Sequence, residues 1–467
     1  IGGFIIVKNI LNEYIDKIFD QLVVDTQEFI SIESTLDEET AEIMAPFGKG
    51  IQKALEYILE KADSMGFSTK NLDGYAGYAQ LGDTGDLVAI LAHVDVVPAV
   101  GDWIVPPYSA QIINGRLYGR GSVDDKGPAI ACLYAMKAIK ECNLPFTKRA
   151  RLLLGTDEET LARGIYYYLD RDETPACGFS PDAEFPIIHA EKGTIRFQYN
   201  LPPADSDILV VDAGTRLNVV PDYAFAKLHG ITEEQVISCA NDLTLKARIS
   251  TQKDGDDINI EVFGAASHAS YPEGGINAIQ NLFLLLKNLY PEPNSALKKS
   301  IHALANALKV ETNGLSAGLF CTDEVSGELT LNTAILKIDK ENHFCKFDIR
   351  YPVTHDGEEL LKKLELSATE CFANYKLIQH KPPLYVEKDR PFIKELQKAY
   401  EESTGEPTNC ISIGGGTYCR YVKNTVSFGP VFPGQKELAH QSNEYISLDD
   451  LRKIAKIYAQ AIYNLIE

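Results

Sequence analysis

The feature that most constrains this chain is an apolar run that ends in two metal-ligand side chains. Leu87–Leu91 has the length and the β-branched content of a strand that is buried on both faces of a parallel sheet. His93 and Asp95 follow it, two residues apart, where such a strand should end. Ligands of open α/β sheets collect outside the carboxyl ends of the strands, and imidazole with carboxylate suits a divalent ion such as zinc. The same pair also occurs in ordinary loops, so the motifs that follow decide between the two.

Two later stretches repeat this pattern of strand and acid. The apolar run Ala150–Leu154 leads into three consecutive acids that include Glu158 and Glu159, and a further acid, Asp182, follows Phe179. Carboxylates directly after a buried strand cost free energy unless they are solvated, paired or bound to a cation. Because the carboxyl ends of parallel strands meet at one edge, we expect these acids and His93 to gather at one edge of an α/β sheet.

A glycine-rich stretch, Gly119–Pro128, lies between the first two strands. It follows a predicted hairpin, Ile112–Tyr118, whose central Asn-Gly pair favours a type I′ turn. Asp124 and Asp125 begin a predicted helix, so capping of its N-terminus is their simplest role. The Gly-x-Gly of this stretch is not a dinucleotide-binding fingerprint, because it follows a hairpin and lacks the third glycine at the required offset.

The pattern of elements changes twice along the chain. With 467 residues the chain is too long for one core. From about residue 187 to about residue 381, alternating strands and amphipathic helices predict an antiparallel α+β domain, which could consist of two halves. We therefore predict an α/β domain from residues 1–186 and 382–467, with a mainly parallel sheet and helices on both faces, and an inserted α+β domain from residues 187–381.

Composition excludes several classes of function. The net charge of −21 argues against nucleic-acid binding, which needs a basic face. No apolar run has membrane-spanning length. The nine cysteines are an odd number without a C-x-x-C pair, which argues against a disulfide framework or a cysteine-based zinc module. A reducing cytoplasm is the expected location.

Two imidazoles and three carboxylates are the candidate metal ligands. They are His93, Asp124, Glu159, Asp182 and His440. Two ions that share one carboxylate would use all five and leave open positions for water or substrate. Spacing alone leaves open that they are five separate structural residues.

Five sequence blocks together resemble the M20 family of dinuclear zinc peptidases, and within it the PepV-type, carnosinase-like Xaa-His dipeptidases of Gram-positive bacteria. The blocks are the His-x-Asp motif, Gly-Arg-Gly-x-x-Asp-Asp-Lys-Gly, Asp-Glu-Glu, Ser-Pro-Asp and a late histidine, which begin at His93, Gly119, Asp157, Ser180 and His440. They occur in the family's order, and the resemblance covers nearly the whole chain. It implies a catalytic α/β domain of the zinc-peptidase type with an inserted lid domain.

The resemblance also implies the metal ligands. One ion would bind His93 and Asp182, the other Glu159 and His440, and Asp124 would bridge them. Zn²⁺ is the expected ion, although the same ligands suit Mn²⁺ or Co²⁺.

Three further features of the catalytic domain follow from the resemblance. Glu158 is the expected general base, which takes a proton from a metal-bridging water and passes it to the leaving amine; capping of a helix is its alternative role. Asp95 is expected to accept a hydrogen bond from His93 and so to fix its tautomer. The Asp124–Asp125 peptide is expected to be cis.

The lid residues are implied in the same way. His268 matches the family histidine that stabilises the tetrahedral oxyanion, with Asn218 as a second donor. Arg350 would bind the substrate's C-terminal carboxylate bidentately, helped by bare backbone N–H groups near Gly415; an ordinary strand-end arginine is the alternative. A lid of this kind limits the substrate to short peptides, and its length implies a monomer.

The expected activity is therefore metal-dependent hydrolysis of dipeptides with a free N-terminus, with a small peptide as partner and neither nucleic acid nor membrane. An aminoacylase, a deacetylase or a carboxypeptidase of the same fold is the alternative enzyme. A non-catalytic metal-binding protein is the alternative from another class, and it predicts a missing ligand or base. The sequence lacks none of them.

Overall fold

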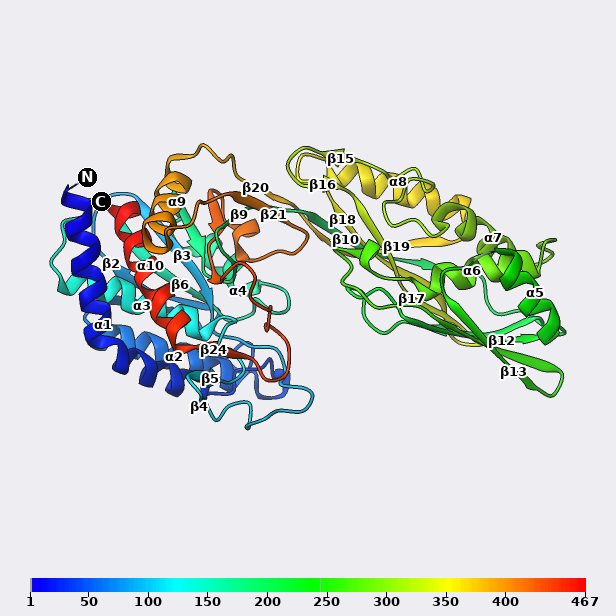
Figure 1. The fold of residues 1–467 in the computed structure, drawn as a ribbon, viewed down its shortest axis with the longest axis horizontal. Helices are drawn as coiled ribbons and strands as arrows, with labels where there is room; N and C mark the ends of the chain where they lie inside the picture. Colours follow the sequence, from blue (N-terminus) through cyan, green and yellow to red (C-terminus); the bar gives the residue numbers. More distant parts are fainter. Residues whose placement is uncertain (1, 244) are drawn as a thin grey trace. The chain divides into compact units, whose positions relative to one another are not determined.

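The computed structural model describes residues 2–243 and 245–467, except for the side chains of residues 2–6. Ile1, the first residue of the predicted α/β domain, lies outside the described residues. The chain forms two compact units (Figure 1). The first comprises the chain up to His189, Val386–Ile411 and Gly416–Glu467, and the second comprises Ala190–Tyr385 and Ser412–Gly415.

The first unit is built on a sheet with a parallel centre. Its strands follow the order β1 (Ser68–Leu72), β2 (Ala76–Leu81), β6 (Arg149–Gly155), β3 (Leu87–His93), β7 (Cys177–Ser180), β22 (Thr425–Ser427) and β9 (Ile187–Glu191), and β21 (Cys410–Ile413) also pairs with β9. The last residues of β9, Ala190 and Glu191, pair with β20 (Leu384–Tyr385), and these four residues belong to the second unit. Strands β6, β3, β7 and β22 run parallel, which confirms the predicted parallel sheet at its centre. The strands at both edges are antiparallel. All seven residues of β3 are buried, as its continuous apolar sequence predicts.

The helices of this unit contact the sheet or pack on one another. They are α1 (Gly2–Ile30), α2 (Lys49–Ser64), α3 (Lys126–Glu141), α4 (Arg163–Arg171), α9 (Pro391–Thr404) and α10 (Leu448–Ile466). α10 packs against α1, α3 and α9, and Figure 1 shows α1 and α10 side by side. α3 contacts β2, β3 and β6, whereas α2 contacts β1 and β2. The buried side of α10 consists of the apolar residues that recur at helical spacing, and Ser447 caps its first turn by accepting from the Asp450 N–H.

Three short strands form a small second sheet in the first unit. They are β4 (Gln111–Ile113), β5 (Arg116–Tyr118) and β24 (Tyr445–Ser447). Asn114 and Gly115 both have positive φ, at 52° and 72°, which confirms the predicted turn. Because β24 pairs with β5, the segment that follows His440 comes to lie beside the glycine-rich stretch. A strand pair, β8 (Ala183–Glu184) and β23 (Pro430–Val431), completes the unit.

The second unit has one antiparallel sheet that carries helices. The strand order is β13 (Arg248–Asp254), β14 (Asp257–Phe263), β12 (Tyr223–His229), β11 (Ile208–Ala213), β17 (Thr330–Ile338), β18 (His343–Tyr351), β10 (Gly193–Asn200) and β19 (Asn374–Lys381). The helices are α5 (Glu233–Leu243), α6 (Ala278–Leu289), α7 (Ala296–Leu308) and α8 (Gly357–Glu370), and β15 (Thr322–Asp323) pairs with β16 (Gly327–Glu328). Its core includes the stacked rings of Phe197 and Phe347, 4.7 Å apart. The predicted α+β class is confirmed.

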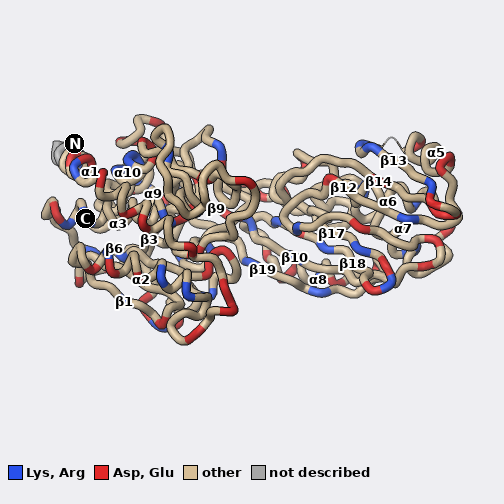
Figure 2. Tube along the Cα trace, turned by 90° about the horizontal axis from the view of Figure 1, so that it is seen from below, with Lys and Arg blue, Asp and Glu red and all other residues tan. Residues whose placement is uncertain are grey.

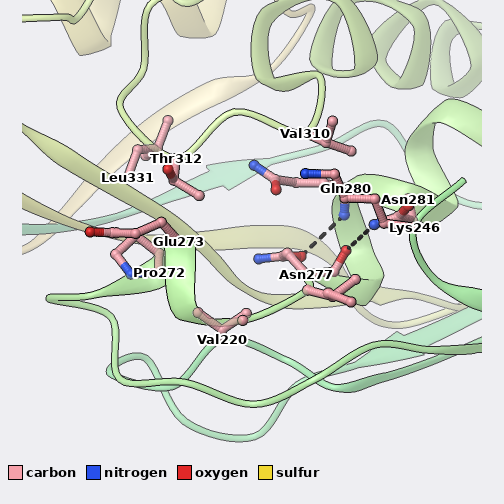
Figure 3. A pocket seen from close by; sticks show the side chains of 12 residues that line it. Val220, Lys246, Pro272, Glu273, Asn277, Gln280, Asn281, Val310, Thr312 and Leu331 are labelled. Atoms are coloured by element: carbon pink, nitrogen blue, oxygen red, sulfur yellow. Dashed lines mark hydrogen bonds between the residues drawn. The ribbon is translucent and has the colours of Figure 1, made fainter.

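A small cavity lies beside the start of α6. It has a volume of about 130 Å³ and is shown in Figure 3. Asn277 lines it and caps the helix, since its side-chain oxygen accepts from the backbone N–H groups of Ile279 and Gln280. None of the described residues that line this cavity is a predicted site residue.

The distribution of charged residues and the hydropathy of the helices agree with what the sequence composition indicates. Acidic residues occur along the whole of both units and are interspersed with lysines and arginines (Figure 2). Within residues 2–243 and 245–467, no helix has the length and apolar content to cross a membrane.

Candidate metal centre

The carboxyl ends of three neighbouring strands bring the predicted ligands together. His93 is the last residue of β3, Glu158 and Glu159 follow β6, and Asp182 follows β7. β3 and β6 pair in parallel with His93 opposite Gly155, so the loops after them leave the sheet at the same edge. This is the edge at which ligands bind in open α/β sheets.

The carboxylate of Asp124 lies between two imidazoles. Its Oδ1 is 2.9 Å from His93 Nε2, and its Oδ2 is 3.1 Å from His440 Nε2. His93 Nε2 also lies 3.7 Å from Asp182 Oδ2, and His440 Nε2 lies 2.9 Å from Glu159 Oε2. The five residues singled out in the sequence therefore form one cluster with Asp124 at its centre.

The surroundings of His93 test whether this cluster suits a metal. The Nδ1–H of His93 donates to the backbone oxygen of Asp95 at 2.9 Å, which places the proton of the neutral ring on Nδ1. Nε2 is buried, yet it makes no hydrogen bond within the described part of the chain. A lone pair that faces carboxylate oxygens is unfavourable unless a cation lies between them. The residues present thus fit divalent metal ions.

Two groups of side chains offer ligand atoms within 4.8 Å of one another. The first consists of His93, Asp124 and Glu159, and the second of His93, Glu158 and Asp182. His93 is fully buried, whereas the His440 side chain is 55% exposed. Within the first unit, the cluster is therefore reached from solvent at His440.

Burial, followed by the charge of neighbouring acids, raises the pKa of three carboxyl groups in this cluster. Burial, with help from the negative charge of Asp124, raises the pKa of Glu159 to about 7 and that of Asp182 to about 6. Burial and the charge of Asp182 raise the pKa of Glu158 well above its ordinary value. These shifts reflect carboxylates that lack sufficient positive charge, which divalent cations would supply.

The pKa values of Asp124 and of the two imidazoles shift as expected for neighbouring groups of opposite charge. Burial opposes ionisation of Asp124, but the imidazoles of His440 and His93 outweigh it and lower the pKa of this carboxyl group. Asp124 and Glu159 in turn raise the pKa of His440 to about 11. Burial alone would lower the pKa of His93, and the surrounding carboxylates, with Asp124 first, raise it well above its ordinary value.

Asp95 contacts the loop of the two glutamates. Its Oδ1 accepts from the Glu158 N–H at 3.2 Å, and its Oδ2 accepts from the Glu159 N–H at 3.1 Å. From the sequence, the Asp95 carboxylate was expected to accept a hydrogen bond from His93. The Nδ1 of His93 lies 3.5 Å from Asp95 Oδ1 but 2.9 Å from the Asp95 backbone oxygen. In the structure the backbone oxygen therefore takes the shorter bond to His93, and the carboxylate holds the glutamate loop.

Three buried acids beside the cluster were not predicted from the sequence. Asp125, which follows the cis peptide expected at Asp124–Asp125, accepts from the His93 N–H at 3.2 Å. Asp157 accepts from Arg163 Nε at 2.7 Å and anchors the same glutamate loop. The third is Glu444, which accepts from Arg120 Nη1 at 2.6 Å. The Asp-Asp and Asp-Glu-Glu runs marked the first two positions, but no local motif marked Glu444.

In the second unit the structure brings His268 and Asn218 together. His268 Nδ1 accepts from the Ser270 N–H at 3.2 Å, so the neutral ring carries its proton on Nε2. The backbone oxygen of Asn218 accepts from the Ala269 N–H at 2.9 Å. A methyl group on Gly414 would collide with the Ser270 side chain, so the glycine segment passes directly against this loop.

Arg350 is buried and already has hydrogen-bond partners. It donates from Nε and Nη2 to the two oxygens of Asp348, and from Nη1 to Thr194 Oγ1 and to the Gly414 oxygen. These four bonds use four of the five N–H groups of a guanidinium. Asp348 also pairs with Arg196 at 2.8 Å, so two guanidinium groups share one carboxylate and the cluster keeps one net positive charge.

Gly415, unlike Gly414, has room for a side chain. A methyl group there would meet only Ile413 Cδ1, at an ordinary 3.5 Å, so packing does not require a glycine at this position.

Comparison with known proteins assigns the chain to a family. The model of peptidase family M20/M25/M40 matches residues 89–464, which include all five residues of the cluster. The chain is 40% identical over 458 residues to the "putative dipeptidase" YtjP of Bacillus subtilis strain 168, covering 96% of this chain and 97% of that protein. It is 33% identical over 467 residues to a "putative dipeptidase" of Staphylococcus aureus strain MRSA252, covering 97% and 98%.

Solved structures share the fold. Human carnosine dipeptidase 1 matches with a TM-score of 0.58 at 15% identity and covers 98% of this chain and 99% of its own. The dipeptidase Dug1p of Saccharomyces cerevisiae matches with a TM-score of 0.59 at 14% identity and covers 98% of both chains. The parallel-centred sheet with a separate antiparallel unit is thus an architecture found in such enzymes. This chain belongs to peptidase family M20/M25/M40 and is a metallopeptidase that hydrolyses peptide bonds.

Proposed function

We propose that this chain is a dipeptidase that works with two divalent metal ions and with Glu158 as its general base. The observation that carries the proposal is the position of Asp124, whose two oxygens each face one imidazole, of His93 at 2.9 Å and of His440 at 3.1 Å. A carboxylate in this position suits a bridge between two ions. The dipeptidase names of the two bacterial relatives support the choice of substrate.

The proposal assigns the ligands by proximity. His93 and Asp182 would hold one ion, Glu159 and His440 the other, and Asp124 would contact both. Zn²⁺ fits this mixture of nitrogen and oxygen ligands, and Mn²⁺ or Co²⁺ fits it as well. When bound, the ions would supply Lewis acidity that polarises the peptide carbonyl and makes a water more acidic.

Glu158 would move the proton. One of its carboxylate oxygens lies within 4.8 Å of a ligand atom of His93 and of Asp182, so Glu158 borders the proposed reaction site. In the proposed role it takes a proton from the attacking water and delivers it to the nitrogen of the leaving amine. Asp95 fixes the backbone of Glu158 through the hydrogen bond at 3.2 Å and so limits where this carboxylate can point.

The second unit would bind the rest of the substrate. We assign His268 Nε2–H, with Asn218, to the oxygen that becomes negative during attack. Arg350 and the backbone near Gly415 would bind the substrate's C-terminal carboxylate, which the net positive charge shared by Arg350, Arg196 and Asp348 favours. A bidentate grip would require Arg350 to give up a present partner, so we assign it a single hydrogen bond from its fifth N–H.

These assignments make the first unit the catalytic domain and the second unit a lid. We further propose that the enzyme is a monomer, to be checked by sedimentation, and that it works in the reducing cytoplasm. None of the nine cysteines forms a disulfide, eight of them have a raised thiol pKa with burial as the main cause, and none is required by the proposed chemistry.

Paired substrates test the proposal. Chelated enzyme is re-supplied with Zn²⁺ or Mn²⁺ and given a free dipeptide, its N-acetylated form and a tetrapeptide. The proposal predicts metal-dependent cleavage of the free dipeptide alone. Cleavage of only the acetylated form would contradict it in favour of an aminoacylase, and efficient cleavage of the tetrapeptide from its C-terminus would favour a carboxypeptidase.

A further inference from the structure

Glu444 is a fully buried glutamate that contacts the glycine-rich stretch. It lies four residues after His440 and directly before β24. Its Oε2 accepts from Arg120 Nη1 at 2.6 Å and from the Gly121 N–H at 3.2 Å. Its Oε1 accepts from the Val123 N–H at 2.8 Å and from the Asp124 N–H at 3.3 Å.

These contacts form an anion site that the protein fills with its own side chain. Three backbone N–H groups within four residues converge on one carboxylate, as they do in backbone nests that bind anions. Arg120, which is 1% exposed, supplies the balancing positive charge. The backbone of Glu444 adds to the same link, because its oxygen accepts from the Gly119 N–H at 3.0 Å.

The consequence concerns the distance between two proposed ligands. Asp124 and His440 are more than 300 residues apart in the sequence, and they stand on two loops that Glu444 ties together. The Glu444 carboxylate accepts from the backbone N–H of Asp124 itself, and Glu444 is only four residues from His440 in the sequence. Movement of either loop would therefore change the 3.1 Å separation between Asp124 Oδ2 and His440 Nε2.

We propose that Glu444 is a positioning residue for the metal centre: it holds the backbone of Asp124 so that this carboxylate meets both imidazoles. The inference rests on the proposed dinuclear function. Among the described residues, the Glu444 carboxylate accepts from Arg120, Ser122 and the backbone N–H groups of the Asp124 loop, so it acts through that loop. A buried ion pair contributes little net stability compared with apolar packing. Positioning of the Asp124 loop therefore explains the buried Glu444–Arg120 pair better than stability does.

The test compares Glu444→Gln with a matched control. The substitution turns one acceptor oxygen into a donor, which then faces either Arg120 or the backbone N–H groups. Asp172→Asn is the control, because Asp172 also accepts from a buried arginine, Arg151 Nη1 at 2.8 Å, and from a backbone N–H, but it contacts none of the cluster. A second variant, Glu444→Asp, keeps the charge and shortens the reach, and it serves if Glu444→Gln does not fold.

The readouts are Zn²⁺ affinity, measured by competition with a chelator, the visible spectrum of the Co²⁺-loaded protein, and the melting temperature of the metal-free protein. We expect both Glu444 variants to bind Zn²⁺ about 10–100-fold more weakly, with a changed Co²⁺ spectrum. Asp172→Asn should lower the melting temperature but keep wild-type affinity.

Either of two outcomes overturns the inference, and they are distinguishable. Wild-type protein that binds two ions, together with a folded Glu444 variant of unchanged affinity and spectrum, would remove the role of Glu444 alone. Wild-type protein that binds fewer than two ions would remove the dinuclear function and the positioning role with it.

Discussion

Asp95 and Glu158 are joined by a hydrogen bond in which the backbone N–H of Glu158 donates to Asp95 Oδ1 at 3.2 Å. The second oxygen of Asp95 accepts from the next N–H, that of Glu159, at 3.1 Å. One carboxylate therefore sets the backbone of the proposed general base and of a proposed metal ligand. The backbone oxygen of Asp95 accepts a hydrogen bond from the Nδ1–H of His93. Asp95 therefore links the His93 ring to the loop that carries Glu158 and Glu159.

Asp95→Asn should lower kcat about 10–100-fold. An amide can accept from only one of the two N–H groups and turns a donor toward the other, so the loop that carries Glu158 should shift. The His93 contact should survive, because it uses the backbone oxygen. Steady-state kinetics at saturating metal would check this, and wild-type kcat would show that the side chain has no influence on the loop.

Glu158→Gln should reduce kcat by about 10²–10⁴-fold, since the amide cannot take up a proton. The variant should retain its metal, because five other side chains surround the proposed ions. Glu159→Gln is the informative partner, and it should lose metal instead. Metal analysis of both purified variants, alongside their rates, separates the two roles. A fully active Glu158→Gln enzyme is the result that the mechanism does not allow.

Stability of the metal-free protein should fall as pH rises from about 4 to 7. Glu159 has its pKa raised to about 7 and Asp182 to about 6 in the folded chain, from ordinary values of 4.5 and 3.8, so the folded state binds protons more tightly in this window. His440, with its pKa raised to about 11, extends the loss above pH 6.5. Asp124 acts in the opposite direction but only below its ordinary value of 3.8.

Metal should reverse this dependence, because binding requires deprotonated ligands. Melting curves at pH 5 and pH 8, with and without Zn²⁺, measure both effects. The account predicts a larger Zn²⁺-induced increase in melting temperature at pH 8. An increase that is equal at the two values would mean that these carboxyl groups do not bind the ion.

His268→Ala should lower kcat about 10²–10³-fold with little change in metal affinity, because the ring is assigned to the oxyanion. Ser270→Ala is a milder companion: it removes the hydroxyl 2.6 Å from Nδ1 but leaves the backbone N–H donor in place. A small effect of Ser270→Ala beside a large one of His268→Ala is the expected pattern. Equal, small effects would contradict the assignment.

Much of the fold, and the gathering of the candidate ligands at one sheet edge, could be predicted from the sequence because the signals are local. The continuous apolar runs of β3 and β6 predict buried parallel strands, and the polar residues directly after them mark the edge where the ligands meet. Helix α10, Leu448–Ile466, has apolar residues at helical spacing, which is likewise a local signal. The strands β1 and β2 were missed, because apolar and polar residues alternate too weakly in them to signal a strand.

What the sequence could not provide are contacts between distant segments. Glu444 accepts from backbone N–H groups more than 300 residues away, and backbone groups leave no trace in residue identity. The hydrogen bond that the Glu158 N–H donates to Asp95 could not be predicted for the same reason. The partners of Arg350 were invisible too, since the register of β18 with β10 and β17 decides which side chains neighbour it.

Titration of the metal-free enzyme with Zn²⁺ tests the central claim most directly. Bound metal per chain and the rate of dipeptide hydrolysis are measured at each addition. A shared Asp124 between two sites predicts that the chain binds two ions and that full activity requires the second. Saturation of both binding and activity at one ion per chain would contradict the dinuclear centre.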